Sequence, residues 1–289
     1  MESAMSGIQW AGRLLAFAMG TMVLFALALP AQACTLFAAQ GTEFVQGGGT
    51  LLVKNRDWKP ESQRLLLRTD KGRYRFYGLY CGEKGHRSLR GGVNEAGVAI
   101  VSASASSIPK TIRHAMPQHG VLTEILAGCG SVEEALAVVQ ETRGPNFLML
   151  ADAKEIAIVE VGRGDAMKVR IVRQGTAAHT NHYLDPAFAD LNIKKGTSSH
   201  MRYNRIAELL RNGEKPFSLD DFLTMSADQN DGPDNGIWRT GSTPTSEQTL
   251  ATMAFHLQEG KAPEIYVKYR READEQGAEK VERFTFPAP

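Results

Sequence analysis

Cys34 follows Ala31-Gln32-Ala33, a segment with the small–any–small pattern after which a signal peptidase cuts. Cleavage there would make Cys34 the first residue of the mature chain, with a thiol and a free α-amino group on one residue. Such an amine can act as the base for its own side-chain nucleophile. An α-amine titrates near ~8 and a cysteine thiol near ~8.5 in model peptides, so modest tuning provides a thiolate at neutral pH. The segment predicts a cysteine nucleophile that is activated by removal of the leader.

Two other interpretations of Cys34 stay open on these residues alone. An exported chain can begin with any residue that follows the cut, and a buried cysteine is usually a small apolar filler. In bacterial lipoproteins a lipid-modified cysteine also follows the signal peptide, although Ala31 stands where those signals usually carry leucine or another aliphatic residue. The first alternative makes Cys34 inert, and the second makes it a lipid anchor.

Residues 1–33 are predicted to form a secretory signal peptide. Their apolar run extends from Leu14 to Leu29, with Arg13 before it and Pro30 after it. This run is short for a spanning helix, and its flanks are those of a signal peptide. No paired arginines precede it, which favours the general secretory route over the twin-arginine route. We therefore expect a periplasmic or secreted protein that has no membrane attachment after the signal is removed.

The remaining residues, 34–289, have an ordinary globular composition. The full sequence is 43% hydrophobic and 22% charged, and its formal net charge is +1 with the positive residues scattered. This balance indicates no nucleic-acid partner. Composition does not shift along the chain and no repeat occurs, so one domain over residues 34–289 is the simpler interpretation. A homo-oligomer stays open.

The other cysteines and two of the histidines are candidates for structural or metal sites. Cys81 and Cys129 would enter an oxidising compartment, but their spacing does not show whether they form a disulfide. His179 and His182 lack the third ligand that a metal site needs. We expect neither a metal nor an organic cofactor.

A dense group of charged residues, Lys54-Asn55-Arg56-Asp57-Trp58, directly follows the apolar run of residues 50–53. Charges of both signs packed so tightly indicate a paired network near a site, with a solvated turn at a strand end as the alternative. A second signal is Asn94-Glu95-Ala96-Gly97, which predicts a hairpin turn. Residues 102–107 are small and predict a loop.

The predicted elements follow the order strands, two helices, strands, helices, strands. This order is typical of layered α+β packing rather than of alternating βαβ units. Ser131 and Glu134 form a capping-box pattern at one helix start, and Ser218 caps another. Strands are expected at residues 35–39, 50–53, 65–67, 74–80, 98–101, 147–150, 156–161, 167–172, 249–257, 264–269 and 281–286, and helices at residues 120–127, 131–143, 199–210 and from residue 218.

Five motifs in this order resemble the penicillin (6-aminopenicillanic acid) acyltransferase and choloylglycine hydrolase superfamily of N-terminal-nucleophile (Ntn) hydrolases. The resemblance covers nearly all of the mature chain. It implies a four-layer αββα fold, in which two antiparallel sheets lie between helices, and cleavage or transfer at a linear amide C–N bond. The motifs are Cys34-Thr35, Lys54-Asn55-Arg56-Asp57-Trp58, Val93-Asn94-Glu95-Ala96-Gly97, Thr180-Asn181 and Ser198-Ser199-His200-Met201-Arg202-Tyr203.

The resemblance also implies roles for individual residues. Cys34 would be the nucleophile, with its α-amine as base and later as acid, and Asp57 would orient that amine. The backbone N–H of Asn94 and the side-chain amide of Asn181 would form the oxyanion hole. Arg202 matches a family arginine near the site.

The resemblance leaves two candidates for the cation that stabilises the Cys34 thiolate. Bile-salt-type relatives carry an arginine three residues before the aspartate, and here that position is Lys54. Lysine keeps the charge but lacks the forked guanidinium geometry, so Lys54 and the adjacent Arg56 both stay candidates. Arg239 matches an arginine of the acyltransferase branch.

The expected function is therefore that of an exported cysteine Ntn amidohydrolase or acyltransferase that acts on a small N-acyl amide through an acyl-Cys34 intermediate. Two alternatives are a lipid-anchored, non-catalytic binding protein on the same fold and an acyltransferase activated by internal cleavage at Gly128-Cys129. Penicillins, N-acyl amino acids, acylated lactones and conjugated bile acids all stay open as substrates, and so does the choice between hydrolysis and acyl transfer.

Overall fold

The computed structural model describes residues 33–287 except 84, 165 and 275. Apart from Ala33, the predicted signal peptide lies outside the described residues, so its prediction stays a prediction. The described residues form an α+β structure with two antiparallel sheets and six helices, one of which is a 3₁₀ helix. This agrees with the α+β class expected from the order of elements.

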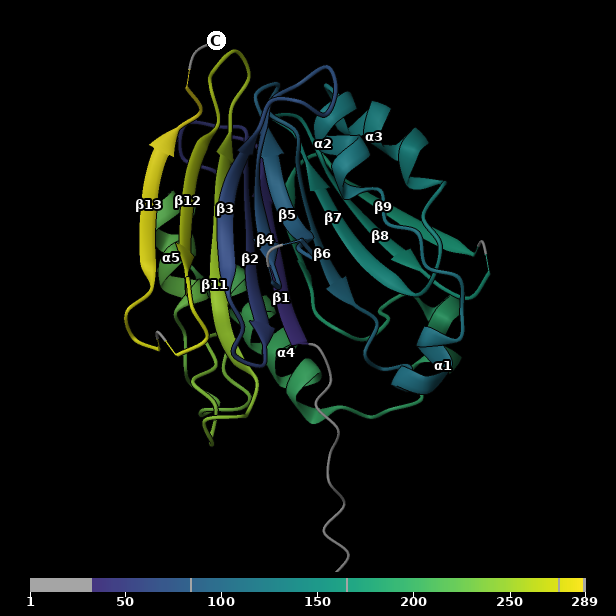
Figure 1. Ribbon diagram of the computed structural model, residues 1–289. Helices are drawn as coiled ribbons and strands as arrows, with labels where there is room; N and C mark the ends of the chain where they lie inside the picture. The colour runs from purple at the N-terminus through teal and green to yellow at the C-terminus, as the bar shows by residue number, and fades with distance from the viewer. Residues whose placement is uncertain (1–32, 84, 165, 275, 288–289) are drawn as a thin grey trace, which may run out of the picture.

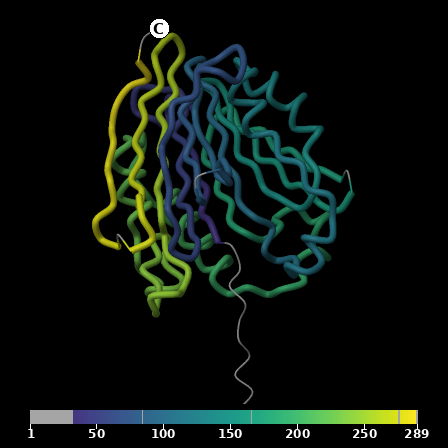
Figure 2. The backbone as a smooth tube through the Cα atoms, in the orientation of Figure 1, coloured from purple at the N-terminus to yellow at the C-terminus, as the bar shows by residue number. Residues whose placement is uncertain are grey.

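The first sheet has six strands in the order β10-β1-β2-β11-β12-β13. The strand that carries Cys34, β1, lies inside this sheet between β2 and β10, whereas the C-terminal strand lies at its edge (Figures 1 and 2). The strands are β1 (Ala33–Gln40), β2 (Thr50–Trp58), β10 (Gly175–His179), β11 (Gln248–Leu257), β12 (Glu264–Tyr269) and β13 (Lys280–Thr285).

The second sheet has seven strands in simple chain order, from β3 to β9. Each strand is antiparallel to the next, so short turns such as Asn94–Gly97 suffice to connect several of them. The strands are β3 (Gln63–Arg68), β4 (Phe76–Cys81), β5 (Ser88–Asn94), β6 (Ala99–Ser104), β7 (Asn146–Ala151), β8 (Ile156–Val161) and β9 (Met167–Val172).

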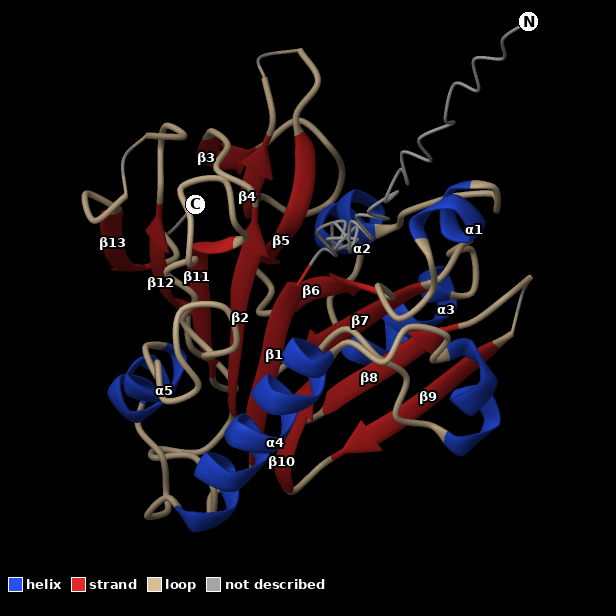
Figure 3. Ribbon diagram, turned by 90° about the horizontal axis from the view of Figure 1, so that it is seen from below, coloured by secondary structure: helices blue, strands red, loops and turns tan. Residues whose placement is uncertain are grey.

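The two sheets pack face to face, and helices cover their outer faces (Figure 3). One hydrophobic cluster lies between the sheets and includes Leu36 and Met149. A second joins the outer face of the second sheet to α2 (Leu122–Gly128) and α3 (Val132–Val139). A third joins the outer face of the first sheet to α4 (Thr197–Asn212) and α5 (Leu219–Ser226).

Local sequence signals account for several helix boundaries. The Ser131 side chain accepts a hydrogen bond from the Glu134 N–H at the start of α3, and Ser218 and Asp221 form a complete capping box at α5. The strands β5 and β10 were not predicted, and neither were two short helices, α1 (Lys110–His114) and the 3₁₀ helix η1 (Pro186–Leu191). Both helices are too short to carry a clear hydrophobic period.

Three predicted boundaries were wrong. The strand expected at residues 50–53 continues as β2 to Trp58, β6 runs to Ser104 into the predicted loop, and α3 ends at Val139. The charged residues of β2 fit within a strand because they are buried and paired there.

The three cysteines are all described and all carry free thiols, so Cys81 and Cys129 do not form a disulfide in this structure. No helix among the described residues is both long enough and apolar enough to cross a membrane.

Candidate active site

Cys34 lies at the start of β1, where the strand begins between its two neighbours. The register of β1 and β2 places Cys34 opposite Arg56 and Ala33 opposite Asp57. Cys34 and Ala33 are 7% and 5% exposed, so both are buried beside polar residues of β2. The charged group of β2 therefore forms part of the Cys34 surroundings and is not a solvated turn.

The two faces of the sheet carry different polar groups. Cys34 and Leu36 belong to the core between the sheets, as does Leu52 on β2. Because side chains alternate along a strand, Lys54 shares this inner face while Asp57 points to the outer, helix-covered face. The thiol and the carboxylate thus approach the start of β1 from opposite faces of one sheet.

Asn181 makes the closest polar contact with the Cys34 backbone. The Cys34 N–H donates to Asn181 Oδ1 at 2.7 Å, and Asn181 Nδ2 donates to Ser104 O at 2.9 Å. Asn181 lies in the segment that follows β10, a neighbour of β1 in the sheet. Cys34 and Asn181 are therefore in direct contact, although the two residues are 147 positions apart.

Arg202 of α4 ties the same groups together. Its Nη1 donates to Cys34 O at 2.6 Å and to Thr35 Oγ1 at 2.9 Å, and its Nη2 donates to Asn181 Oδ1 at 3.1 Å. The side chain is 1% exposed, and burial lowers the pKa of the guanidinium, although the Asp57 carboxylate opposes this effect. Arg202 holds the first peptide of β1 and the Asn181 amide in one arrangement.

Asp57 is a buried carboxylate with unused hydrogen-bonding capacity. Thr249 Oγ1 of β11 donates to Asp57 Oδ1 at 2.8 Å, whereas Asp57 Oδ2 is buried without a hydrogen-bond partner among the described residues. Burial raises the pKa of Asp57, and the charges of Arg202 and Arg239 act in the opposite direction. An acceptor that is buried and unpartnered next to Ala33 can accept a hydrogen bond from a nearby amine.

The two candidate tuning cations have different partners. Arg56 donates to Gln63 Oε1 at 3.1 Å and forms an ion pair with Glu61, so its guanidinium is held by side chains on the chain just after β2. Lys54 Nζ donates to the Arg90 carbonyl at 2.6 Å and is buried on the face of Cys34. Burial lowers the pKa of Lys54 to about 8, and a negative charge on the neighbouring Cys34 sulfur would oppose that shift.

A cavity of about 940 Å³ opens beside Ala33. Hydroxyl and cationic side chains provide much of its wall, including Lys59, Lys194 and Arg202. Arg239 also lines it, and its Nη1 donates to Glu247 Oε2 at 2.6 Å. Arg239, Asn181 and Arg202 therefore line the same cavity.

Asn94, whose backbone N–H was predicted to belong to the oxyanion hole, forms its hydrogen bonds elsewhere in this structure. Its backbone N–H donates to Val98 O at 2.9 Å within the β5–β6 hairpin, and its side chain donates to the carbonyls of Leu126 and Cys129. Asn94 is four residues beyond Arg90 on β5, or about 13 Å along the strand from the Lys54 contact. Asn94 holds a turn against α2, and Asn55 of the charged motif donates to the carbonyls of Ser226 and Ile237.

Several residues at the site carried no sequence signal. Thr249 reaches Asp57 across 192 positions and Glu247 pairs with Arg239, but each is an ordinary polar residue before or within a predicted strand. Ser199 was within a recognised motif, and its Oγ accepts the Asn181 N–H at 2.9 Å. Only the folded arrangement of strands identifies these contacts.

Cys129, the residue at the alternative internal cleavage point, lies in a different layer. It belongs to the cluster between the second sheet and its helices, and its N–H donates to Ile125 O at the end of α2. An N-terminus created there would have neither Asn181 nor Asp57 beside it. The structure offers no support for that alternative.

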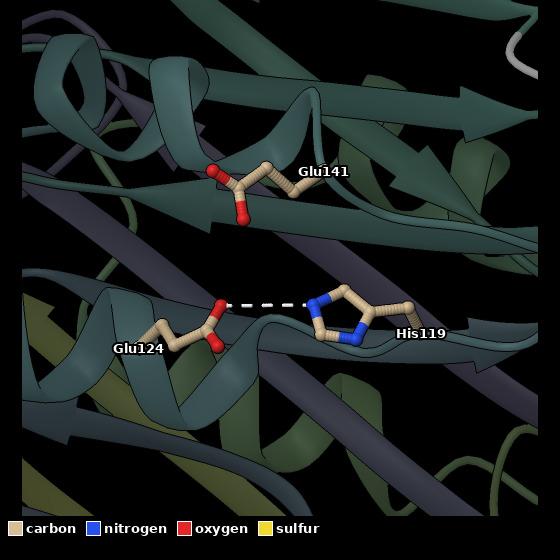
Figure 4. A group of neighbouring side chains, drawn as sticks. All are labelled: His119, Glu124 and Glu141. Carbon is tan, nitrogen blue, oxygen red and sulfur yellow. Dashed lines mark ion pairs between the residues drawn. The ribbon is translucent and has the colours of Figure 1, made fainter.

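One further group of titratable side chains among the described residues could hold a metal ion (Figure 4). His119, Glu124 and Glu141 place their ligand atoms within 4.8 Å of one another, and His119 Nε2 lies 3.9 Å from Glu124 Oε2. All three are exposed, on the helix-covered side of the second sheet. A surface ion pair accounts for this group, and we assign it no role at the site.

A family model and several solved structures match the chain. Residues 45–270 match the family described as acyl-coenzyme A:6-aminopenicillanic acid acyl-transferase, and the match begins after Cys34. None of the curated protein sequences compared with the chain matches it significantly.

The matches among solved structures concern the fold. Two variants of the conjugated bile acid hydrolase from Clostridium perfringens superpose with a TM-score of 0.52 at 14% and 13% identity, covering 88% of this chain and 97% of theirs. The Caenorhabditis elegans ortholog of N-acylethanolamine-hydrolyzing acid amidase also gives 0.52 at 13% identity, with 77% and 92% covered. At these identities the similarity shows a common Ntn-hydrolase fold. With a family match over more than three quarters of its length, the chain belongs to the acyl-coenzyme A:6-aminopenicillanic acid acyl-transferase family of the Ntn-hydrolase superfamily.

Proposed function

We propose that the protein is an exported cysteine amidohydrolase or acyltransferase that cleaves linear amide C–N bonds through an acyl-Cys34 intermediate. The proposal rests on one observation: three polar side chains meet at the first peptide of β1. Asn181 accepts the Cys34 N–H, Arg202 binds the Cys34 carbonyl, and Asp57 lies opposite Ala33 with an unpartnered buried oxygen.

In the proposed reaction the Cys34 thiolate attacks the amide carbon, and a C–S bond forms as the carbonyl oxygen becomes an oxyanion. The protonated α-amine of Cys34 then gives its proton to the leaving nitrogen as the C–N bond breaks. Water, or a second amine, releases the acyl group from sulfur. These steps need no metal or organic cofactor.

The α-amine of Cys34 is the base that the surroundings favour. His182 lines the same cavity, but burial and the neighbouring His200 lower the pKa of His182 to about 3. An imidazole with so low a pKa is a weak base at neutral pH. The carboxylate of Asp57 is placed to accept a hydrogen bond from the amine and to orient it.

Removal of the leader would change the site in two ways. It would turn the Cys34 peptide nitrogen into an amine, and it would remove Ala33 from the wall of the cavity. The cavity would then reach Cys34. We propose that cleavage takes place on export to the periplasm or the exterior, and that residues 34–289 form the mature domain.

A panel of N-acyl amides assayed with the processed protein tests the function. The named activities of the matched structures, hydrolysis of conjugated bile acids and of N-acylethanolamines, suggest small N-acyl amides as the first substrates. The protein with Cys34→Ala is the control. Cys34-dependent release of amine from any member supports the proposal, and an intact mass showing a lipid on Cys34 would replace it with the anchor alternative.

Asn181→Ala is expected to lower kcat by about 10²–10³-fold, the usual effect of losing one oxyanion-hole donor. The physical reason is that Asn181 Nδ2 carries two N–H groups, and while one donates to Ser104 O, the other can donate to an oxyanion that forms at Cys34. Steady-state kinetics on the best amide of the panel would measure the loss.

Asn181→Asp is a second variant that separates the N–H donor of this side chain from its oxygen acceptor. Aspartate keeps an oxygen that can accept from Arg202 and from the Cys34 nitrogen, but it has no N–H to donate. A similar loss in both variants identifies the donor as the important group, whereas near-normal turnover with aspartate would remove Asn181 from the oxyanion hole.

Lys54→Met is expected to slow alkylation of Cys34 at pH 7 by about tenfold or more, because a neighbouring positive charge favours the ionised form of an acid. Since the pKa of Lys54 is about 8, the difference between wild type and variant should shrink as the pH rises through 8. The rate of iodoacetamide labelling at Cys34, followed by mass spectrometry from pH 6 to 9, measures it.

The matched control is Lys54→Arg, which retains the charge at the same place. Its labelling rate should stay close to that of the wild type, and a rate as low as that of Lys54→Met would show that packing, and not charge, is responsible. Loss of reactivity in Arg56→Met alone would assign the tuning role to Arg56.

A further inference from the structure

We propose that Glu160 is a positioning residue that fixes the segment carrying Asn181, and hence the oxyanion-stabilising amide, relative to Cys34. This inference rests on the proposed function. Glu160 lies on β8 of the second sheet and is 5% exposed, whereas Asn181 follows β10 of the first sheet. The carboxylate therefore connects the second sheet to the end of β10 in the first sheet.

Glu160 binds both ends of the segment from residue 179 to residue 185. Its Oε1 lies 2.8 Å from His179 Nε2 and accepts the Leu184 N–H at 2.7 Å, and its Oε2 accepts the Asp185 N–H at 3.1 Å. A buried carboxylate is costly unless several donors satisfy it, and here three donors do so. All three belong to the segment that carries Asn181.

The middle of the segment is held from the other side by α4. Ser199 Oγ accepts the Asn181 N–H at 2.9 Å and lies 2.8 Å from His182 Nδ1 and 3.0 Å from Thr180 Oγ1. The Asn181 backbone is thus bound on the helix side, while Glu160 binds the flanking residues on the sheet side. Ser199 and Glu160, the two anchors of this segment, together direct the Asn181 side chain at the Cys34 nitrogen.

Aromatic packing completes the anchor at Glu160. The Phe147 ring lies 4.3 Å from the His179 ring and 4.8 Å from the Tyr183 ring, between centroids, and the Tyr183 hydroxyl donates to Val161 O at 2.8 Å. The segment therefore has little room to adjust by itself. A donor in an oxyanion hole must be placed to within about 0.5 Å, so loss of the central carboxylate should reach Asn181.

Glu160 touches neither Cys34 nor the cavity beside it, and the alternative is that it stabilises the fold without affecting the chemistry. The two cases differ in which reactions of Cys34 they change. Acylation by p-nitrophenyl acetate passes through an oxyanion, as the thiolate attacks the ester carbon and p-nitrophenolate leaves. Alkylation by iodoacetamide displaces iodide in one step and forms no oxyanion.

The test uses the processed protein beginning at Cys34, with both reagents and with Cys34→Ala as the background. Glu160→Gln keeps the shape and loses the charge, and we expect it to slow p-nitrophenolate release at least tenfold while alkylation stays within about twofold. Equal slowing with both reagents, or no slowing with either, would overturn the proposal.

The matched control is Glu155→Gln, which removes a carboxylate just before β8 that pairs with the exposed Arg173. It should leave both reactions unchanged. If Glu160→Gln does not fold, Ser199→Ala removes the other anchor of the segment and should show the same selective loss. A wild-type protein that shows no Cys34-dependent acylation would instead contradict the proposed function.

Discussion

Replacement of Cys34 by serine in the processed protein is expected to lower kcat on N-acyl amides by about 10⁴-fold or more. A serine hydroxyl is far less acidic than a thiol, and neither the α-amine nor Lys54 is expected to ionise it at neutral pH. Steady-state turnover and detection of the acyl-enzyme by mass spectrometry would measure the effect. The acyl adduct should appear on Cys34 in the wild type and be absent in the variant.

Cys129→Ser is the matched control, because Cys129 is another buried free cysteine that lies in the outer layer and not at the site. It should retain normal turnover. Turnover by the Cys34→Ser protein within tenfold of the wild type would end the assignment of Cys34 as nucleophile, and an effect confined to Cys129→Ser would revive the internal-cleavage alternative.

Retention of Ala33 before Cys34 is expected to lower kcat by about 10²–10⁴-fold, the usual contribution of a general base. A peptide nitrogen is not basic, and in this form the Cys34 N–H donates to Asn181 Oδ1. Two protein samples beginning at Ala33 and at Cys34, prepared by cleavage of a removable leader, would be compared in the same amide assay.

Alkylation of Cys34 by iodoacetamide provides the control for this comparison. Both samples should still be labelled, which would show that the thiol is present and reachable in each. Equal turnover by the two samples would remove the amine from the mechanism, and it would leave Asp57 without the partner proposed for it.

Much of the layered arrangement could be predicted from local pattern. The short apolar run of residues 35–39 anticipated β1, and the serine caps at residues 131 and 218 anticipated the starts of α3 and α5. These features depend on neighbouring residues only, so the sequence displays them directly. Two of the three wrong boundaries are strand ends, and at one of them, the last five residues of β2, burial in the sheet overrode local polarity.

The choice between Lys54 and Arg56 as the cation that stabilises the Cys34 thiolate could not be made from the motif alone. Lys54 and Arg56 are both basic, both within the motif and both on the inner face of β2. The structure separates them by their partners, because Arg56 is bound by Glu61 and Gln63 while Lys54 is bound through one backbone carbonyl of β5. Which partners a side chain meets depends on strands far away in the sequence.

The sequence by itself determined which groups are available for chemistry: a cysteine that can become the first residue, the acid and cations of the motif that follows, and the amide of Asn181. The tertiary structure decided which of them share a site. It brought Asn181, Arg202 and Asp57 to the first peptide of β1, and it left Asn94 in a distant hairpin. The physical reason is that strand order and register set distances across the sheets, and contacts such as that of Thr249 with Asp57, 192 positions apart, arise only when the strands pair.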